Sequence, residues 1–500
     1  MSETVFPRTL VLVDASLSAQ DRSERKSAKR YVAFAVVNLL FGFTVASLEL
    51  FGEPSSRSSS LYLFLLCLLC SSPLLVCDRF NGLYSILIVF TPLYFMFYGM
   101  GDLVAYVPGM SLYRTHPPDE LFTEGELAIL LGAACLIAGY LLVAFTSSKP
   151  LSRGITRDWP VRTIVILGLI FWASGLWATW IWQFRFADTR ISTMQESNMG
   201  ALLTLFRMLQ PVGSTLLSYA YLKTGRTSLL CLLVTLMVIE LPFGLIADSK
   251  ELAIRTGMIF IFAKWLYDGS VPSRWLIIAA VTIVTIFPIF QAYRYEVLQA
   301  RSNSREKAIQ NLSRSLELAF DSSSGGKEHE LKQGVRAFSG RIDLKGNMET
   351  IVHKTGHDVP FQNGHTISLL SYALIPRLVL PDKPDSSVGQ IFNRAFHVSL
   401  DPDTYISATH LGELFWNYGW TGVIIGMLAI GGIMGTVSCG TALADHKSVT
   451  RLLLMISTVY LLGLRFEGGI AMQYTQWIRS LCLIAVLHLF FRTRAQPVES

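Results

Sequence analysis

Charged residues are scarce in this chain. Only 16% of its 500 residues are charged, 51% are hydrophobic, and the mean hydropathy is +0.44. Because soluble domains carry about 25% charged residues, this composition excludes a soluble globular protein and indicates a membrane protein. The formal net charge of +6 comes mostly from short basic loops, so it does not indicate nucleic-acid binding.

The chain also lacks the motifs of several other functional classes. It contains no GxxxxGK(S/T) or GxGxxG phosphate-binding loop, so an ATP-driven pump is not supported. All seven cysteines lie in or beside apolar stretches, which excludes a disulfide framework. His353 and His357 have the spacing of a helical metal pair but lack the glutamate of the zinc-protease pattern. We therefore expect no cofactor and no metal site.

What the chain does have is a succession of long apolar stretches. A transmembrane helix needs about 20 largely apolar residues, and twelve stretches qualify. They cover residues 31–52, 60–77, 82–99, 124–146, 161–184, 200–222, 227–247, 251–268, 274–292, 411–437, 450–466 and 475–491. The fold class that we predict is an all-α polytopic membrane protein with about twelve transmembrane helices and one large extracytoplasmic loop.

The distribution of lysine and arginine predicts the orientation of these helices. Short cytoplasmic loops carry an excess of both residues. When the N-terminus is placed inside, most basic residues of the short loops fall in the cytoplasm, and both termini are cytoplasmic. The predicted organisation is a cytoplasmic segment 1–30, helices one to nine in 31–292, an extracytoplasmic loop 293–409, helices ten to twelve in 410–491 and a cytoplasmic tail 492–500.

Ionisable residues within the predicted spans are concentrated on one side of the membrane. Each is costly there and is therefore a functional hypothesis. In the predicted topology nearly all lie toward the outer ends of the spans, beneath the long loop, and structural ion pairs alone do not explain that one-sidedness. They are Glu49, Glu124, Glu126, Arg207, Glu240, Lys250, Glu251, Arg255, Glu413, Arg465, Glu467 and Arg479.

Three strings in and after the long loop form a recognisable combination. The first two are Gly340-Arg-Ile-Asp343 and Pro376-Arg-Leu-Val-Leu-Pro-Asp-Lys-Pro384. The third is His410-Leu-Gly-Glu-Leu-Phe-Trp-Asn-Tyr-Gly-Trp-Thr-Gly-Val423. Together they resemble the O-antigen and capsular polysaccharide repeat-unit polymerases (Wzy-type) of bacterial inner membranes. The predicted topology extends this resemblance loosely over the rest of the chain.

The resemblance implies a reaction in the outer leaflet of the cytoplasmic membrane. A polysaccharide on a polyprenyl diphosphate is transferred to a sugar hydroxyl of a new lipid-linked repeat unit. The implied fold is that of lipid-dependent glycosyltransferases. The implied partners are polyprenyl-diphosphate-linked oligosaccharides, membrane lipid, and a chain-length regulator and a flippase of the same pathway. Because the donor is a lipid diphosphate, no nucleotide site is expected.

Such a reaction needs fixed positive charge beside the leaving group. Arginine forms bidentate contacts with phosphates and stabilises the charge that develops on a departing diphosphate. Arg341 and Arg377 of the long loop are therefore assigned to the catalytic group. The candidate substrate-binding residues are Arg207, Lys250, Arg255, Arg294, Lys383, Arg465 and Arg479.

The acceptor hydroxyl needs a general base. His410 and Glu413 are the candidates, because they lie where the loop re-enters the membrane and can share one helical face. Histidine titrates near neutral pH, so we favour His410 as the base or acceptor-orienting group. Glu413 is expected to be its structural partner or to pair with Lys250, Arg255 or Arg465.

Two other functions remain open from the sequence. An O-antigen ligase-like glycan transferase would differ only in its acceptor, which no residue pattern identifies. A non-enzymatic exporter or flippase of lipid-linked glycans would carry its cargo across the bilayer. An exporter therefore predicts polar residues in the inner halves of the spans, where this chain has few.

Overall fold

The computed structural model is helical over the residues that it describes, where the one β contact is an isolated bridge between Thr355 and Val359. The described residues are 29, 31–47, 60–76, 85–105, 122–146, 159–185, 198–246, 250–268, 272–279, 282, 344–375, 379–380, 384, 388–399, 405–442 and 448–491. A polar helix predicted near residues 301–320 and most of the span predicted at 274–292 lie outside them.

Most helices lie in the ranges that the apolar stretches predict, and α15, α16 and α17 lie in the predicted loop. An unnumbered helix spans Tyr31–Ser47. The labelled helices are α2 (Ser60–Ser71), α3 (Pro73–Val76), α4 (Ser85–Ala105), α5 (Glu124–Thr146), α6 (Val161–Arg185), α8 (Asn198–Arg207), α9 (Leu209–Thr224), α10 (Thr227–Ile246), α11 (Lys250–Asp268), α15 (Lys345–Lys354), α16 (His365–Leu374), α17 (Val388–Phe396), α18 (Thr409–Ala442), α19 (Val449–Thr458), the π-helix η1 (Val459–Leu464) and α20 (Ile470–Phe491).

Six of the described helices are long and apolar enough to cross a membrane. They lie in α4, α5, α6, α10, α18 and α20, and three shorter apolar helical stretches cover Tyr31–Ser47, Ser60–Val76 and Val449–Leu464. The chain is therefore a helical membrane-spanning protein. The total of twelve spans, the large external loop and the orientation of the termini stay predictions.

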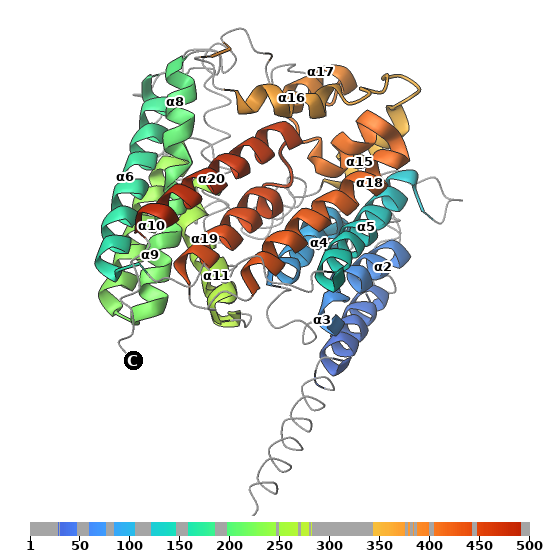
Figure 1. Ribbon diagram of the computed structural model, residues 1–500. Helices are drawn as coiled ribbons and strands as arrows, with labels where there is room; N and C mark the ends of the chain where they lie inside the picture. The colour runs from blue at the N-terminus through green and yellow to red at the C-terminus, as the bar shows by residue number, and fades with distance from the viewer. Residues whose placement is uncertain are drawn as a thin grey trace, which may run out of the picture.

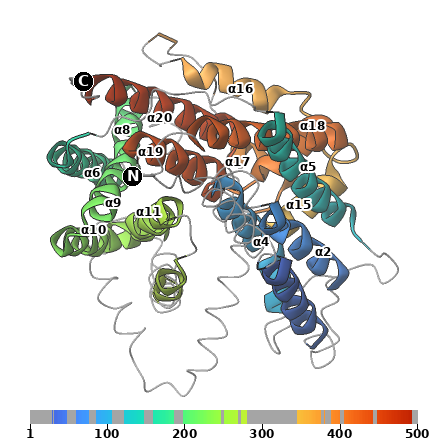
Figure 2. The ribbon, with the colours of Figure 1, turned by 60° about the horizontal axis from the view of Figure 1, so that its bottom comes forward.

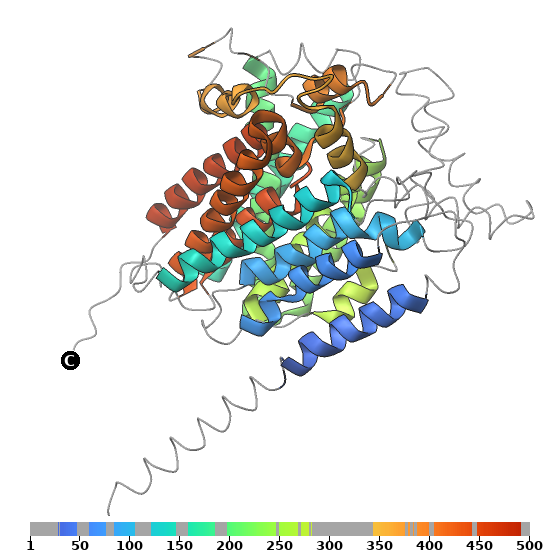
Figure 3. The same ribbon diagram turned by 90° about the vertical axis from the view of Figure 1, so that its right-hand side faces the viewer.

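The helices form two groups joined by a central pair. In Figure 1, α6, α8, α9 and α10 form one side of the molecule, and α18, α5, α4 and α2 form the other. The central α19 and η1 contact both groups, α9 and α11 on one side and α18 and α4 on the other (Figure 2). Helices α16 and α17, from the predicted loop, lie across one end of the bundle (Figures 1 and 3).

Three helices are interrupted, and the interruptions position the functional residues. Met208 separates α8 from α9, and α19 continues into the π-helix η1. Helix α18 bends at Tyr418 and Gly419, where Gly419 has φ +59° and ψ −143°. Glycine tolerates this conformation because it has no Cβ. Irregular backbone at membrane depth is accepted where it lines a cavity or is buried in protein, and the first two interruptions border the same cavity.

Lys345 ties the loop helix α15 to the bundle. Its Nζ lies 2.6 Å from Asp102 Oδ2 of α4 and 2.6 Å from Glu126 Oε1 of α5, and all three side chains are buried. The ammonium also lies 4.6 Å from the centroid of the Tyr62 ring. Burial alone would lower the pKa of Lys345, but the two carboxylates outweigh burial, and the pKa is raised. The lysine is therefore charged.

The same glutamate also fixes the start of α5. Thr123 Oγ1 accepts a hydrogen bond from the Glu126 amide at 3.1 Å, and Glu126 Oε2 accepts one from the Thr123 amide at 3.0 Å. This is a capping box, which satisfies two amides that a helix start leaves without partners. The other face of α15 packs Met348 and Ile351 against Gly412 in the first turns of α18. Helix α15 thus connects α4 and α5 to the residues beside His410 and Glu413.

Candidate functional site

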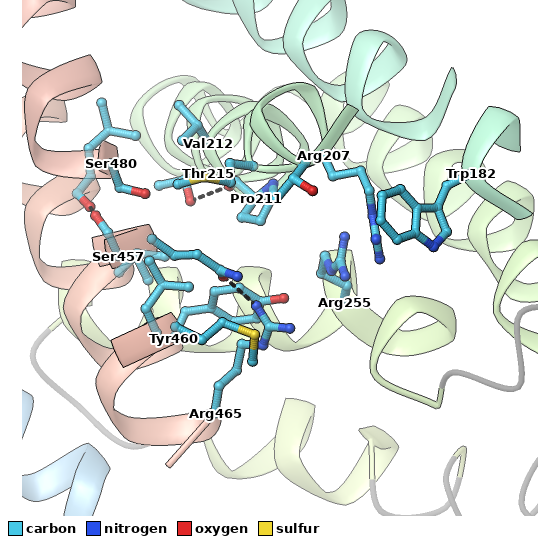
Figure 4. A pocket seen from close by; sticks show the side chains of 17 residues that line it. Trp182, Arg207, Pro211, Val212, Thr215, Arg255, Ser457, Tyr460, Arg465 and Ser480 are labelled. Carbon is cyan, nitrogen blue, oxygen red and sulfur yellow. Dashed lines mark hydrogen bonds between the residues drawn. The ribbon is translucent and has the colours of Figure 1, made fainter. Parts of the chain in front are cut away.

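A cavity of about 170 Å³ lies between the α6–α9 group and the central helices. Arg207 of α8, Arg255 of α11 and Arg465 after η1 reach it from three separate parts of the chain (Figure 4). The remaining lining residues are Trp182, Thr204, Met208, Pro211, Val212, Thr215, Leu453, Ile456, Ser457, Tyr460, Leu461, Met472, Gln476 and Ser480.

Arg255 is held in place by a buried hydrogen-bond network. Its Nη1 donates to Gln210 Oε1 at 2.9 Å, and Gln210 Nε2 donates to Glu240 Oε1 at 2.7 Å. Glu240 also accepts hydrogen bonds from the Trp172 indole and from the amide and hydroxyl of Thr256. A buried carboxylate needs such partners to offset its lost hydration. Glu240 therefore orients Arg255 through Gln210.

Arg465 shares a carboxylate with Arg255. Arg465 Nε lies 3.3 Å from Glu251 Oε2, and Arg255 Nη2 lies 3.2 Å from Glu251 Oε1. Glu251 also accepts a hydrogen bond from the Tyr460 hydroxyl. A second donor group of Arg465, Nη1, donates to Gln476 Oε1 at 2.7 Å. One glutamate thus fixes two arginines and leaves part of each guanidinium directed to the cavity.

Arg207 has a different environment from the other two arginines. Its guanidinium carbon lies 5.3 Å from the centroid of the Trp182 ring, which is a cation–π geometry. Among the described residues, no carboxylate forms an ion pair with Arg207. Its donors are therefore available to an anion without breaking an existing ion pair. Figure 4 shows Arg207 and Arg255 directed to the same space.

The cavity combines positive charge with an apolar wall. Its described lining includes three arginines and no acidic residue, and Glu251 beside it offsets only part of their charge. Fixed guanidinium groups in a partly dry cavity bind phosphates well, because planar donors match phosphate oxygens. The apolar part of the lining contains Pro211, Val212, Leu453, Ile456, Leu461 and Met472. The combination suits an anion attached to a hydrocarbon group.

His410 and Glu413 form a second cluster near this cavity, in the first turns of α18. The His410 ring is fully buried, with centroids 4.8 Å from Phe466 and 5.7 Å from Tyr474, and neither ring nitrogen has a hydrogen-bond partner among the described residues. Glu413 Oε2 accepts a hydrogen bond from the Ile470 amide at 2.7 Å. Buried polar groups without partners are uncommon, so His410 is retained as a candidate for a functional role.

The backbone before His410 is held in a strained conformation. Thr409 has φ +59°, which is unfavourable for a β-branched residue. Its hydroxyl accepts hydrogen bonds from the Tyr98 hydroxyl at 2.9 Å and from the Gly412 amide at 3.0 Å. Strain of this kind persists where the surroundings hold it, and it is frequent at functional sites.

A single turn, residues 465–470, connects the two clusters. Arg465 opens the turn and lines the cavity, whereas the carbonyl of Phe466 accepts a hydrogen bond from the His410 amide at 3.2 Å. Ile470 closes the turn and binds Glu413. The short segment from Arg465 to Ile470 thus positions Arg465, His410 and Glu413. It keeps the cationic cavity beside a candidate base.

Three of the predicted substrate-binding residues lie together and others do not. Arg207, Arg255 and Arg465 line the same cavity. Arg479 does not line it, because its Nη2 donates to the Ala373 carbonyl at 2.9 Å and joins α20 to α16. The other basic candidates, which are Arg294, Arg341, Arg377, Lys383 and the side chain of Lys250, lie outside the described residues.

Two of the expected partners of Glu413, Arg255 and Arg465, are wrong, and the side chain of the third, Lys250, lies outside the described residues. Arg255 and Arg465 pair with Glu251, and Glu413 binds a backbone amide instead. His410 forms no hydrogen bond with Glu413 either. The physical reason is the turn at 465–470, which places Phe466 and Ile470 against these two residues and directs Arg465 into the cavity.

Several residues of the site had no signal in the sequence. Trp182, Tyr460 and Gln476 occur in apolar spans, where aromatic or amide residues are ordinary. Their roles follow from contacts between distant segments, so only the fold identifies them. Glu251 was noticeable as a buried charge, but its double pairing with Arg255 and Arg465 was not predictable from spacing.

Comparison with protein-family models, curated proteins and solved structures finds no match to this chain.

Proposed function

We propose that this protein is a polysaccharide polymerase of the Wzy type, which elongates a surface glycan from polyprenyl-diphosphate-linked repeat units at the outer face of the bacterial cytoplasmic membrane. The observation that carries the proposal is the three-arginine cavity with an apolar wall, joined by one turn to a buried histidine and glutamate. A lipid diphosphate has the matching parts, an anion and a hydrocarbon chain.

The proposed reaction uses these groups in two roles. The acceptor hydroxyl oxygen attacks the anomeric carbon of the donor sugar, and the bond from that carbon to the diphosphate oxygen breaks. The diphosphate leaves with the electron pair, and Arg207, Arg255 and Arg465 stabilise its charge. His410 takes the hydroxyl proton. Glu413 holds the turn at 465–470 through the Ile470 amide.

The experiment that tests this proposal is a transfer assay with purified protein in vesicles that contain the lipid-linked repeat unit. His410→Phe keeps the ring packing against Phe466 and Tyr474 but removes both ring nitrogens. We expect it to reduce the rate by about 100-fold or more, the usual contribution of a general base. Glu413→Gln retains an oxygen for the Ile470 amide, so we expect a much smaller loss.

The control for this comparison is His365→Ala, which removes an exposed histidine at the start of α16 and should leave the rate unchanged. A normal rate for His410→Phe together with an inactive Glu413→Gln would exchange the two roles. Release of polyprenyl diphosphate without longer glycans would favour transfer to another acceptor.

A further inference from the structure

A second hollow lies along α18, beside its bend at Tyr418 and Gly419. It is an open groove of about 740 Å³, between the segment before α16 and the bend of α18. This volume lies within the usual range for small-molecule sites, about 300–1,000 Å³. The residues that define its chemistry are Phe361, Asn363, Asn417, Tyr418, Thr421 and Ile425.

The bend in α18 builds this groove. A bent helix leaves carbonyl groups without their normal partners. The Trp416 carbonyl accepts a hydrogen bond from the Gln362 amide at 3.0 Å, and the Asn417 carbonyl accepts one from the Asn363 amide at 3.2 Å. These bonds fix the segment that contains Phe361 beside Tyr418. The groove is therefore formed by the backbone before any ligand binds.

The lining of the groove is uncharged and mostly apolar, with a few amide and hydroxyl groups. None of its described lining residues is charged, in contrast with the arginine-lined cavity. The side chains of Phe361 and Tyr418 are 40% and 51% exposed and present aromatic surface. Asn363, Asn417 and Thr421 add amide and hydroxyl groups. Aromatic faces pack on the C–H faces of sugars, and amides and hydroxyls exchange hydrogen bonds with sugar hydroxyls.

One buried group in the lining favours a polar ligand. Asn417 Nδ2 donates to Thr366 Oγ1 at 2.6 Å and to the Glu413 carbonyl at 2.7 Å, which fixes the orientation of the amide. Its Oδ1 has no hydrogen-bond partner among the described residues. A hydroxyl donor would satisfy it, whereas a hydrocarbon chain would leave the cost of its burial in place.

The groove lies beside the proposed catalytic residues. Leu414 and Asn417 line the groove, and they follow Glu413 by one and four positions on the same helix. A chain in the groove therefore lies within about two helical turns of His410. Arg465 lines the arginine cavity, and the turn that it opens contacts His410 and Glu413. The two hollows share no lining residue and both lie near these two residues, so they can hold two different substrates.

We propose that this groove binds the acceptor glycan and that the sugars lying in it are uncharged. This inference rests on the proposed function, because it assigns the second substrate of the same reaction. An acidic sugar is excluded because the groove offers no cation among its described residues, and an unpaired carboxylate is costly to desolvate.

The test uses purified full-length protein in detergent and two probes. The first is the single repeat-unit oligosaccharide, freed from its carrier by mild acid, and the second is polyprenyl diphosphate. We expect Phe361→Ala and Tyr418→Ala to weaken oligosaccharide binding about fivefold or more and to leave polyprenyl diphosphate binding unchanged. Thr421→Val, which alters one exposed hydroxyl, should give a smaller loss in the same direction.

Two controls separate a glycan from the other occupants. Ile425→Ala shortens an exposed apolar side chain of the groove and should weaken oligosaccharide binding less than Phe361→Ala or Tyr418→Ala does. Weakened polyprenyl diphosphate binding by this variant would identify a lipid-chain groove and overturn the proposal. Oxidation of the primary hydroxyls of the oligosaccharide to carboxylates should weaken binding about tenfold or more. Equal binding of the oxidised form would also overturn it.

The two experiments separate failure of the groove assignment from failure of the proposed function. If wild-type protein binds the oligosaccharide at these residues but transfers no glycan, the groove assignment stands and the polymerase assignment fails. If transfer occurs and no groove variant changes oligosaccharide binding, the groove assignment fails alone.

Discussion

Replacement of Arg207 by alanine is expected to reduce the rate of glycan transfer by about 100-fold, the usual cost of removing one preorganised donor to transition-state charge. Among the described residues Arg207 pairs with no carboxylate, and its contact in the protein is the ring of Trp182. Removal of its charge therefore leaves no acidic group uncompensated. The variant should be present in the membrane at normal levels, which separates loss of activity from loss of folding.

The substitution series around Arg207 makes this prediction specific. Arg207→Lys keeps the charge but loses the planar pair of donors, so we expect an intermediate rate. The matched control is Arg162→Ala, at the opposite end of α6 from Trp182, where the arginine is exposed and should not matter. Normal transfer by Arg207→Ala would exclude the cavity as the diphosphate site.

The largest expected effect on stability comes from Lys345→Met. This substitution leaves Asp102 and Glu126 buried without the ammonium that lies 2.6 Å from each. Removal of one partner from a buried ion pair costs about 3–5 kcal/mol, a large part of the stability of a typical domain. We expect low protein levels and a much reduced melting temperature. Lys354→Met on the same helix loses one hydrogen bond, to the Phe396 carbonyl, and serves as the control.

Two further measurements identify charge as the cause. The triple variant Lys345→Met, Asp102→Asn, Glu126→Gln removes the unpaired charges and should recover part of the stability. The pKa of Lys345 is raised from its usual 10.5, so its stabilising contribution is complete below that pH and is lost as the pH rises through the raised pKa. The contribution of this lysine to the melting temperature should therefore be constant between about pH 7 and 9. An unchanged melting temperature for Lys345→Met would contradict the account.

The positions of the helices were predictable because membrane spans need long apolar runs, and such runs are visible without knowledge of packing. Helices α5 and α6 begin at the predicted residues, Glu124 and Val161. The interruptions were not predictable. Met208 and the residues of η1 have no unusual composition, and their irregular backbone depends on packing around the arginine cavity.

The candidate site was predictable only in part, because its contacts also depend on how the helices pack. Arginines in apolar spans stand out, so Arg207, Arg255 and Arg465 could be selected from the sequence. Their partners depend on which helices meet. Lys345 is one of many polar residues of the predicted loop, and nothing near it in the sequence indicates its contacts with Asp102 and Glu126.

The most direct test of the central proposal is the glycan profile of the source organism without this protein. A polymerase predicts that single repeat units replace the ladder of long chains, and that wild-type protein restores the ladder whereas the Arg207→Ala variant does not. Long chains that accumulate on the carrier lipid would instead identify a ligase-like transferase. Absence of any lipid-linked glycan outside the membrane would identify an exporter and contradict the account.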